Sequence, residues 1–418
     1  MKKIRAVIKT FFFTLLALDA AVFVMVYIMG EGVAESYKIN KGETLQLETG
    51  VPVKAVFDAD TVGGYNVGDT FSVDLKMFGV IPFSKVDVEV VDEMYAVALG
   101  TPFGMKLYTE GVLVVNTTDV ETAAGLLNPA REAGIKIGDY IKSANGVQIT
   151  CNEDLSELVV GSNGAAVRLE TVRDGQIIVR NVTPVQSADG SGYRIGIWVR
   201  DSSAGIGTLT FYSPSTGVVC GLGHGICDSD TGSLLKVDSG ELVGAQIVSV
   251  DKGSNGDPGE LKGRFTAEKI CNISLNSEGG VYGLLTGKVD ASNVIEIALK
   301  QEVRDGEAQI LCTVDGDKPA LYSCNVEKRM SAYHSDTQNL TVTITDPKLI
   351  ETTGGIVQGL SGSPILQNGK LVGAVTHVLV DDPTKGYAIF AENMLETAQF
   401  VGEGSSLPQE ENKLKDAS

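Results

Sequence analysis

The chain has 418 residues, of which 43% are hydrophobic and 21% are charged, and its formal net charge is −19. This composition is typical of a globular chain with two or three domains and excludes a wholly disordered one. The negative charge argues against a nucleic-acid-binding protein, because the phosphate backbone would repel it, and it is compatible with cationic partners.

The first thirty residues have the pattern of an export signal. A basic stretch at 1–9 precedes an apolar run that extends to Met29, with Asp19 near its middle, and about 20 apolar residues suffice to cross a bilayer. The basic flank should stay in the cytoplasm. Residues 1–30 are therefore predicted to be a cytoplasmic flank and a transmembrane signal anchor, with the rest of the chain exported. A cleaved signal peptide is the main alternative, and a buried core helix is a third.

The cysteines do not indicate a metal site. No two of the six have Cys-x-x-Cys spacing, so neither a metal nor another cofactor is expected. Export permits disulfides, but a chain of this length does not need them to build a core. We expect mostly buried free thiols.

Residues 31–92 are predicted to form a linker and a short β segment. Apolar and polar residues alternate at 51–57, 71–75 and 86–90, and alternation with a period of two indicates half-buried strands.

Residues 93–185 combine short strands with two short helical runs. The pattern of Ala130, Gly134, Gly138-Asp139 and Asn145-Gly146 resembles the PDZ domain signature, in which a glycine ends a helix and Asn-Gly makes a hairpin turn. PDZ domains bind an extended peptide beside a sheet edge. The resemblance implies a peptide-binding loop, with backbone N–H groups facing an anion, at Phe103, Gly104 and Met105.

Residues 190–402 are rich in glycine and in short Val, Ile, Leu and Thr runs. Frequent turns between short strands predict a β-barrel or sandwich. A helix is expected from 391 to 400, and the polar tail at 403–418 is expected to be disordered.

A serine on a glycine-rich turn is the first candidate for catalysis. The segment Gly-Leu-Ser-Gly-Ser-Pro at 359–364 resembles the Gly-Asp-Ser-Gly-Gly-Pro turn of chymotrypsin-like peptidases. Ser361 aligns with the nucleophile, and the amides of Gly359 and Ser361 could form an oxyanion hole. Ser363 is the alternative nucleophile. Leu360 stands where trypsin-like zymogens carry an aspartate that pairs with a new N-terminus, so activation must work differently here.

A serine hydroxyl needs a base, and the chain has three histidines. His224 lies between glycines directly after a hydrophobic run, so it is predicted to stand at a strand end, where a general base can reach a cleft. His377 is the alternative base, although it follows the serine. His334 lies in a polar stretch and is expected to be on the surface.

A third residue should orient the imidazole of the base. The order His, Asp, Ser requires an acid between 224 and 361, and Asp346 ends an alternating strand in that interval. Asp228 and Asp230 are closer to His224 in sequence, but their expected role is to form a turn.

These features together resemble the stage IV sporulation protein B serine peptidase family. The resemblance covers roughly residues 90–400 and includes the PDZ-like pattern, Gly-Leu-Gly-His at 221–224, Thr-Asp-Pro at 345–347 and the serine turn. It implies a mainly β chain with a chymotrypsin-like peptidase domain, and it supports Asp346 as the acid.

The resemblance also implies a membrane-tethered endopeptidase of the forespore intermembrane space that cleaves itself free near its N-terminus, within about 31–75. It would then cleave a membrane regulatory protein and so release processing of a late sigma factor. Two other functions are considered: a catalytically inactive PDZ scaffold, and a general quality-control protease of the extracytoplasmic space.

Overall fold

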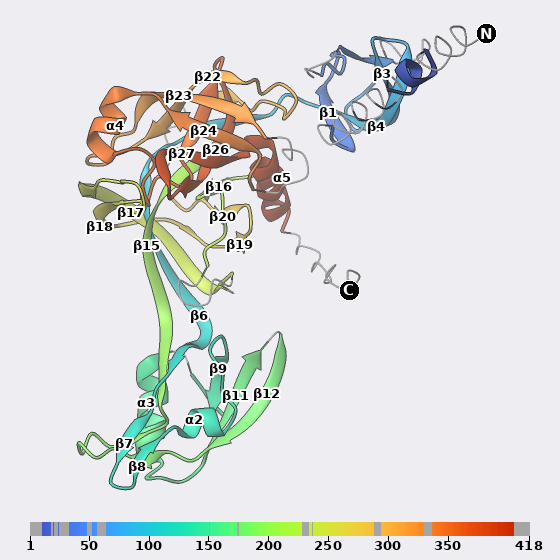
Figure 1. The fold of residues 1–418 in the computed structure, drawn as a ribbon. Helices are drawn as coiled ribbons and strands as arrows, with labels where there is room; N and C mark the ends of the chain where they lie inside the picture. Colours follow the sequence, from blue (N-terminus) through green and yellow to red (C-terminus); the bar gives the residue numbers. More distant parts are fainter. Residues whose placement is uncertain are drawn as a thin grey trace.

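The computed structural model describes residues 11–17, 20, 24, 33–47, 52–56, 64–149, 151–173, 175–227, 234, 235, 237–287, 294–329 and 337–404. The described chain is mainly β and forms three units (Figure 1). They are an N-terminal unit (33–92), a middle unit (111–199) and a large unit that combines 94–109 with 202–404.

The N-terminal unit is one four-stranded sheet. Its strands, in the order β1-β4-β3-β2, are β1 (Ser36–Asn40), β4 (Ile81–Val91), β3 (Thr70–Met77) and β2 (Val53–Val56). β1 is parallel to β4, whereas the other pairs are antiparallel. Alternate residues of β3 and β4 are buried against Tyr37 and Ile39 of β1, as the period of two in their sequence predicts.

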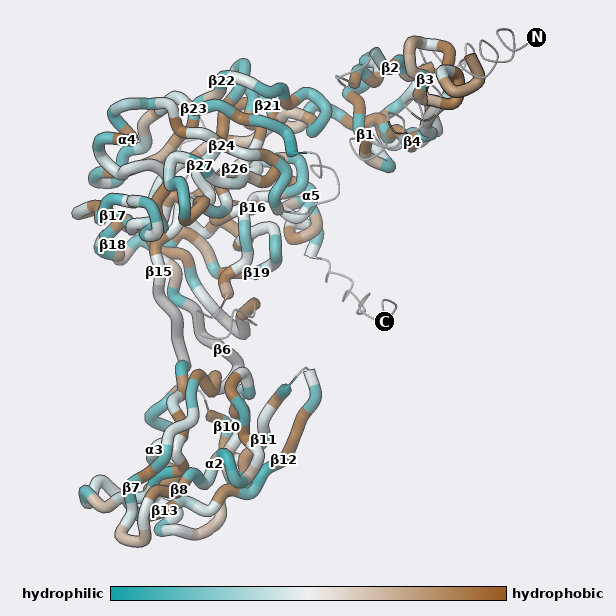
Figure 2. The backbone as a smooth tube through the Cα atoms, in the orientation of Figure 1, coloured by the Kyte–Doolittle hydropathy of each residue, from teal (hydrophilic) through white to brown (hydrophobic). Residues whose placement is uncertain are grey.

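The middle unit packs two helices against short strands. These elements are β7 (Val120–Thr122), β8 (Gly125–Leu127), α2 (Pro129–Glu132), β9 (Tyr140–Ala144), β10 (Val147–Gln148), α3 (Asn152–Gly161), β11 (Val167–Arg173), β12 (Gln176–Val182), β13 (Val185–Gln186) and β14 (Tyr193–Arg194). Hydrophobic and hydrophilic residues alternate at the start of β11, whereas β12 carries a continuous apolar run at 177–179, which Figure 2 shows in brown. Leu155 and Val159 of α3 are buried in the core, which extends to Ile195.

Two long antiparallel strands pass from the middle unit into the large unit. β6 (Pro102–Thr117) and β15 (Ile197–Ser213) pair over most of their length, and Figure 1 shows them as the connection between the two units. Gly111 bends β6 at the crossing with a φ of 93°, where a Cβ would lie 2.3 Å from the carbonyl oxygen of Ile141. Only glycine fits this close approach.

The large unit has two β-rich halves. The first contains β5 (Tyr95–Ala98), β16 (Val218–Gly221), β17 (Val237–Asp251), β18 (Glu260–Asn272), β19 (Leu275–Ser277), β20 (Gly280–Leu284) and β21 (Val294–Glu296). The second is a closed barrel in the order β22-β23-β24-β27-β26-β25. Its strands are β22 (Gly306–Cys312), β23 (Ala320–Lys328), β24 (Leu340–Ile344), β27 (Asp382–Phe390), β26 (Lys370–Leu379) and β25 (Pro364–Gln367), with helices α4 (Pro347–Thr353) and α5 (Ala391–Gly402).

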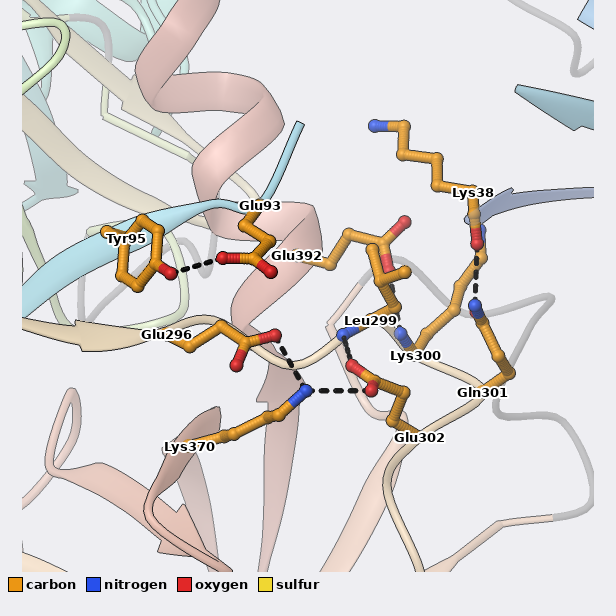
Figure 3. A network of polar contacts seen from close by, with 10 residues as sticks. All are labelled: Lys38, Glu93, Tyr95, Glu296, Leu299, Lys300, Gln301, Glu302, Lys370 and Glu392. Atoms are coloured by element: carbon orange, nitrogen blue, oxygen red, sulfur yellow. Dashed lines mark hydrogen bonds and ion pairs between the residues drawn. The ribbon is translucent and has the colours of Figure 1, made fainter. Parts of the chain in front are cut away.

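Polar contacts join the N-terminal unit to the large unit (Figure 3). The side-chain amide of Gln301 donates to the carbonyl oxygen of Lys38 at 2.6 Å, and Lys38 forms an ion pair with Glu396 of α5. Glu392, only 1% exposed, accepts from the amide of Lys300 at 2.6 Å. Burial raises the pKa of the Glu392 carboxyl. The N-terminal sheet is therefore attached to the large unit by specific contacts.

Several predictions can be compared with this fold. Most of the predicted membrane helix lies outside the described residues, and no helix within the described ranges is long and apolar enough to span a bilayer. The helix predicted from 391 is α5. All six cysteines are free, and four of them are buried. The predicted boundary at 185–190 differs from the structure, because the core of the middle unit continues to Ile195.

The prediction of an open peptide-binding loop at Phe103, Gly104 and Met105 is corrected by the structure. These residues lie within β6 in the large unit and are paired on one side with β15 and on the other with β17. Phe103 is fully buried, and a Cβ on Gly104 would lie 2.4 Å from the ring of Phe265. A strand with both edges paired has no free N–H groups to offer an anion.

Candidate active site

The serine turn joins the end of α4 to the barrel strand β25, and glycine shapes it. Gly359 and Gly362 have φ values of 99° and 94°, in the region that side chains disfavour. A Cβ on Gly362 would lie 2.0 Å from the carbonyl oxygen of Thr208 and 2.4 Å from the amide nitrogen of Leu222. The turn can thus pack directly on the backbone of the first half of the large unit.

Two buried threonines of β15 hold the carbonyl groups of this turn. The hydroxyl of Thr208 donates to the carbonyl oxygen of Gly359 and that of Thr210 donates to the carbonyl oxygen of Gly362, both at 2.7 Å. Within the described part of the chain, the amides of Gly359 and Ser361 donate to no acceptor. The two open amides are the pair of hydrogen-bond donors that an oxyanion hole requires. The threonine hydroxyls fix the turn that carries them.

His224 follows β16 at the end of a strained turn. Leu222 and Gly223 both have positive φ values, 68° and 67°, and a Cβ on Gly223 would lie 3.1 Å from the Thr376 methyl group. The Nδ1 atom of His224 donates to the carbonyl oxygen of Gly225 at 2.8 Å. This bond assigns the neutral tautomer with its proton on Nδ1, which leaves Nε2 as the acceptor.

The barrel hairpin β25–β26 brings a second histidine to the same place. The rings of His224 and His377 lie with their centroids 4.7 Å apart, and His377 directly follows Thr376. The hydroxyl of Ser361 donates to the carbonyl oxygen of Thr376 at 2.7 Å. Ser361 and the two histidines are therefore grouped at one site, and the serine hydroxyl is bonded to a backbone carbonyl group.

The pKa values of both imidazoles at this site are lowered, which favours their neutral forms. Burial lowers the pKa of His224, and its bond to the Gly225 carbonyl opposes this shift only in part. Burial also lowers the pKa of His377, and the neighbouring His224 lowers it further. A neutral imidazole at neutral pH can accept a proton, as a general base must.

Asp346 is not brought together with His224. It is the N-cap of α4, where its carboxylate accepts from the amides of Lys348 at 2.9 Å and Leu349 at 3.2 Å. Its other oxygen accepts from the amide of Ser323 at 3.2 Å. Partial burial raises the pKa of Asp346, but these amide hydrogen bonds outweigh burial and lower it overall. In this geometry a carbonyl group, that of Gly225, orients the His224 ring.

The other candidates have different surroundings. Ser363 is fully buried and its hydroxyl donates to the carbonyl oxygen of Leu360 at 2.6 Å, so it supports the turn. Asp228, Asp230 and His334 lie outside the described residues. No cluster of three or more metal-ligating side chains occurs in the part of the chain that the structure describes.

Sequence reasoning missed Thr208 and Thr210, because nothing in a Thr-x-Thr strand pattern shows which carbonyls the hydroxyls will meet. It also missed a groove in the middle unit. This groove, of about 460 Å³, lies between α3 and the first residues of β15 and is lined by Leu155, Ser156, Val159, Ile197, Trp198 and Val199, among others. Here β15 pairs with β6 on one edge only.

Comparison with known proteins gives a family for the large unit. Residues 191–395 match the family model described as SpoIVB peptidase S55. Among curated proteins, a putative zinc metalloprotease of Lactococcus lactis subsp. lactis is 39% identical over 69 residues, which are 16% of this chain and 16% of that protein. The chain thus matches only a small part of this curated relative.

Two solved serine proteases are similar at low identity. The active form of the Rv3671c protease from M. tuberculosis is 17% identical with a TM-score of 0.25, over 49% of this chain and 77% of that chain. A thermostable serine protease, AL20, from an extremophilic microorganism is 11% identical with a TM-score of 0.29, over 48% and 92% of the two chains. With TM-scores this low, neither structure contributes to the argument for the site.

Proposed function

Because residues 191–395 are a serine endopeptidase domain of the SpoIVB peptidase S55 family, we propose that the chain is a membrane-tethered, self-processing signalling protease. It cleaves a membrane regulatory protein between the two forespore membranes during sporulation, which leads to activation of a late sigma factor. One observation carries the peptidase chemistry: Ser361 lies beside the His224 segment, with two open amides on its own turn.

The chemistry follows from these groups. The hydroxyl of Ser361 turns from the Thr376 carbonyl to Nε2 of His224, gives up its proton and attacks the peptide carbonyl carbon. The amides of Gly359 and Ser361 stabilise the oxyanion. His224 then gives the proton to the leaving amine as the C–N bond breaks, and a water molecule repeats these steps on the acyl-enzyme.

The hydrogen bond of Ser361 in this structure supports a regulated enzyme over a general protease. The Ser361 hydroxyl is bonded to the carbonyl of Thr376, so activity requires this bond to be exchanged for one to the imidazole. Leu360 is fully buried and cannot form the ion pair that activates trypsin-like zymogens. Activation must therefore work differently from that of trypsin-like zymogens.

The serine assignment is tested with a matched pair of alanine variants. Ser361→Ala should abolish self-cleavage and lower peptide hydrolysis by about 10⁴-fold or more. Ser363→Ala removes one buried hydrogen bond, costs about 1 kcal/mol of stability and should leave hydrolysis within a few-fold. N-terminal sequencing of the products locates the bond that is cut. Identical products from wild type and Ser361→Ala would refute the assignment.

The signalling role is tested by comparing substrates. Hydrolysis of a membrane regulatory protein from an endospore-forming host should exceed that of unfolded casein by orders of magnitude in kcat/KM. Equal rates on both substrates would favour the quality-control alternative, and no hydrolysis of either would favour an inactive scaffold.

The groove of the middle unit supports a PDZ role, and we propose that its peptide site lies along β15. Ile197, Trp198 and Val199 present an unpaired strand edge toward α3, to which an extended peptide can add. Gly196, with a φ of 76°, turns the chain into this edge. The proposed site is about ninety residues after the position predicted from sequence.

Groove binding is tested with a labelled peptide of residues 48–63, which lie within the predicted self-cleavage zone. In a Ser361→Ala chain, Ser156→Trp should fill the groove and reduce peptide binding at least tenfold, measured by fluorescence anisotropy. Glu157→Trp adds the same bulk to the exposed neighbouring position of α3, which does not line the groove. Equal affinity of both variants would rule out this groove.

A further inference from the structure

Residues other than glycine with positive φ occur at five places in the described chain. Three of them, Asn145, Asn163 and Asn368, are asparagines, the residue type that tolerates this conformation best. The other two are the apolar residues Leu222 and Phe78. Leu222 lies at the active site, next to Gly223 and His224. Because strained residues cluster where function requires them, Phe78 also calls for an explanation.

Phe78 lies at the tip of the β3–β4 hairpin in the N-terminal unit. Phe78 and Gly79, with φ values of 52° and 74°, are the central residues of a tight turn closed by a hydrogen bond from the amide of Val80 to the carbonyl oxygen of Met77 at 3.1 Å. Such turns favour Asn-Gly, the pair that this chain uses in its turns at 145–146 and 368–369. Turn formation therefore does not account for a phenylalanine here.

The tip presents apolar side chains to solvent. Phe78 is 57% exposed, Val80 is 74% exposed and Ile81 is 43% exposed. Consecutive exposed apolar residues are costly in water unless they have a partner. Val80 and Phe78 are the two most exposed large apolar side chains among the described residues of this unit.

Lysines surround this tip in a chain whose net charge is −19. Lys54 of β2 and Lys76 of β3 stand directly opposite each other, and Lys85 of β4 lies on the same solvent-facing side of the sheet. Like charges in direct register destabilise a sheet. Among the described residues none of the three lysines forms an ion pair. Asp74 stands directly opposite Lys85, further from the tip than Lys76, so Lys54 and Lys76 are the lysines without an acid in the paired register.

The topology directs the tip toward the predicted membrane anchor. β1 is parallel to β4, and its first residue Ser36 pairs with Asp87. The chain therefore enters the sheet from the side on which the tip lies, and the six residue steps from Asp87 back to Ile81 extend about 20 Å further in that direction. The apolar run ends at Met29, seven residues before Ser36, a separation that spans at most about 25 Å.

We propose that the β3–β4 hairpin tip is a membrane-insertion element: Phe78, Val80 and Ile81 enter the interfacial region of an anionic bilayer while Lys54, Lys76 and Lys85 contact the lipid headgroups. Apolar groups embedded below a basic rim are the recognised chemistry of interfacial binding. This contact goes beyond the proposed protease activity. It would keep the N-terminal unit on the membrane surface after the anchor is cut.

Tryptophan fluorescence of the full chain tests this proposal. The chain has one tryptophan, Trp198, so Phe78→Trp is made in a Trp198→Phe, Ser361→Ala background that cannot process itself. In vesicles of phosphatidylcholine and phosphatidylglycerol, emission from position 78 should shift to shorter wavelength and be quenched by brominated acyl chains. Val248→Trp in the same background is the control, because Val248 is equally exposed, at 57%, but lies in the large unit.

Charge reversal tests the headgroup contact. Lys54→Glu with Lys76→Glu should lower the ratio of inserted to free tip at least about 30-fold, since each lysine contributes about 1 kcal/mol near an anionic surface and each new carboxylate is repelled by it. Lys252→Glu with Lys318→Glu makes the same change in net charge at exposed positions of the large unit and should leave insertion unchanged. The proposal would be overturned if quenching at position 78 were no greater than at position 248. It would also be overturned if both double reversals changed insertion equally.

Discussion

The two histidines beside Ser361 and the carboxylate of Asp346 show two opposite ways of controlling an ionisable group. Burial lowers the pKa of both imidazoles, and the neighbouring His224 lowers that of His377 further, so both rings are kept neutral. Three backbone amides keep the carboxylate of Asp346 charged at the start of α4, although it is partly buried. The first arrangement prepares a base for proton transfer, whereas the second stabilises a helix. An ionisable residue at the right place in chain order can therefore serve either purpose.

The largest expected effect is that of His224→Ala. If His224 is the base, this change should lower kcat/KM for peptide hydrolysis by about 10⁴-fold while the circular dichroism spectrum stays that of the wild type. A loss of less than tenfold would exclude His224 as the base and direct attention to His377.

His377→Asn should have an intermediate effect, about 10- to 100-fold on kcat/KM. Its ring lies 4.7 Å from that of His224, so removing it admits water and should raise the pKa of His224 toward its ordinary value of 6.5. The acid limb of the pH–rate profile should then move to higher pH, as a pH series on both proteins would show. An unchanged limb would mean that His377 does not influence the base.

The same histidines affect stability in a definite direction. Their pKa values are lowered in the folded protein, so the unfolded chain binds more protons below about pH 6.5. Stability should therefore fall as the pH drops below 6.5, and it should fall less in His377→Asn. Denaturant titrations at several pH values measure this difference.

Asp346→Ala should have the smallest effect on activity. Loss of the N-cap should cost about 1 kcal/mol of stability, with hydrolysis kept within a few-fold at a temperature where the variant is folded. The lowered pKa of Asp346 gives stability that is present above pH 3.8 and lost as the pH falls further. The triad role predicted from sequence requires instead a loss of about 10⁴-fold in the same Asp346→Ala variant, so its rate of hydrolysis decides between the two roles.

The sequence predicted the parts of the site that depend on local geometry. Glycines at 359, 362 and 223 mark turns that only glycine can make, so Ser361 and His224 stood out without any knowledge of the fold. The Asp-Pro pair at 346–347 also carried a local signal, because Asp at an N-cap followed by Pro at N1 starts a helix. Chain order favoured a catalytic role over that signal.

Contacts between distant segments could not be predicted in the same way. His377 comes after the serine in sequence, and only the β25–β26 hairpin places its ring against His224. The sequence predicts a peptide-binding loop near 103, but this part of β6 is paired on both edges. The strand edge without a partner is that of residues 197–199 in β15. Register and edge pairing arise from the assembled sheet, and no single segment records them.

One strand has consequences for the whole molecule. β15 forms the wall of the groove at 197–199, and eleven residues later its Thr208 and Thr210 hold the carbonyls of the serine turn. Both positions lie on β15, so a peptide that added to the proposed groove would act on the same strand whose threonines hold the carbonyls of the serine turn. β15 is therefore the element through which binding at the proposed groove would change the position of the serine turn in the large unit.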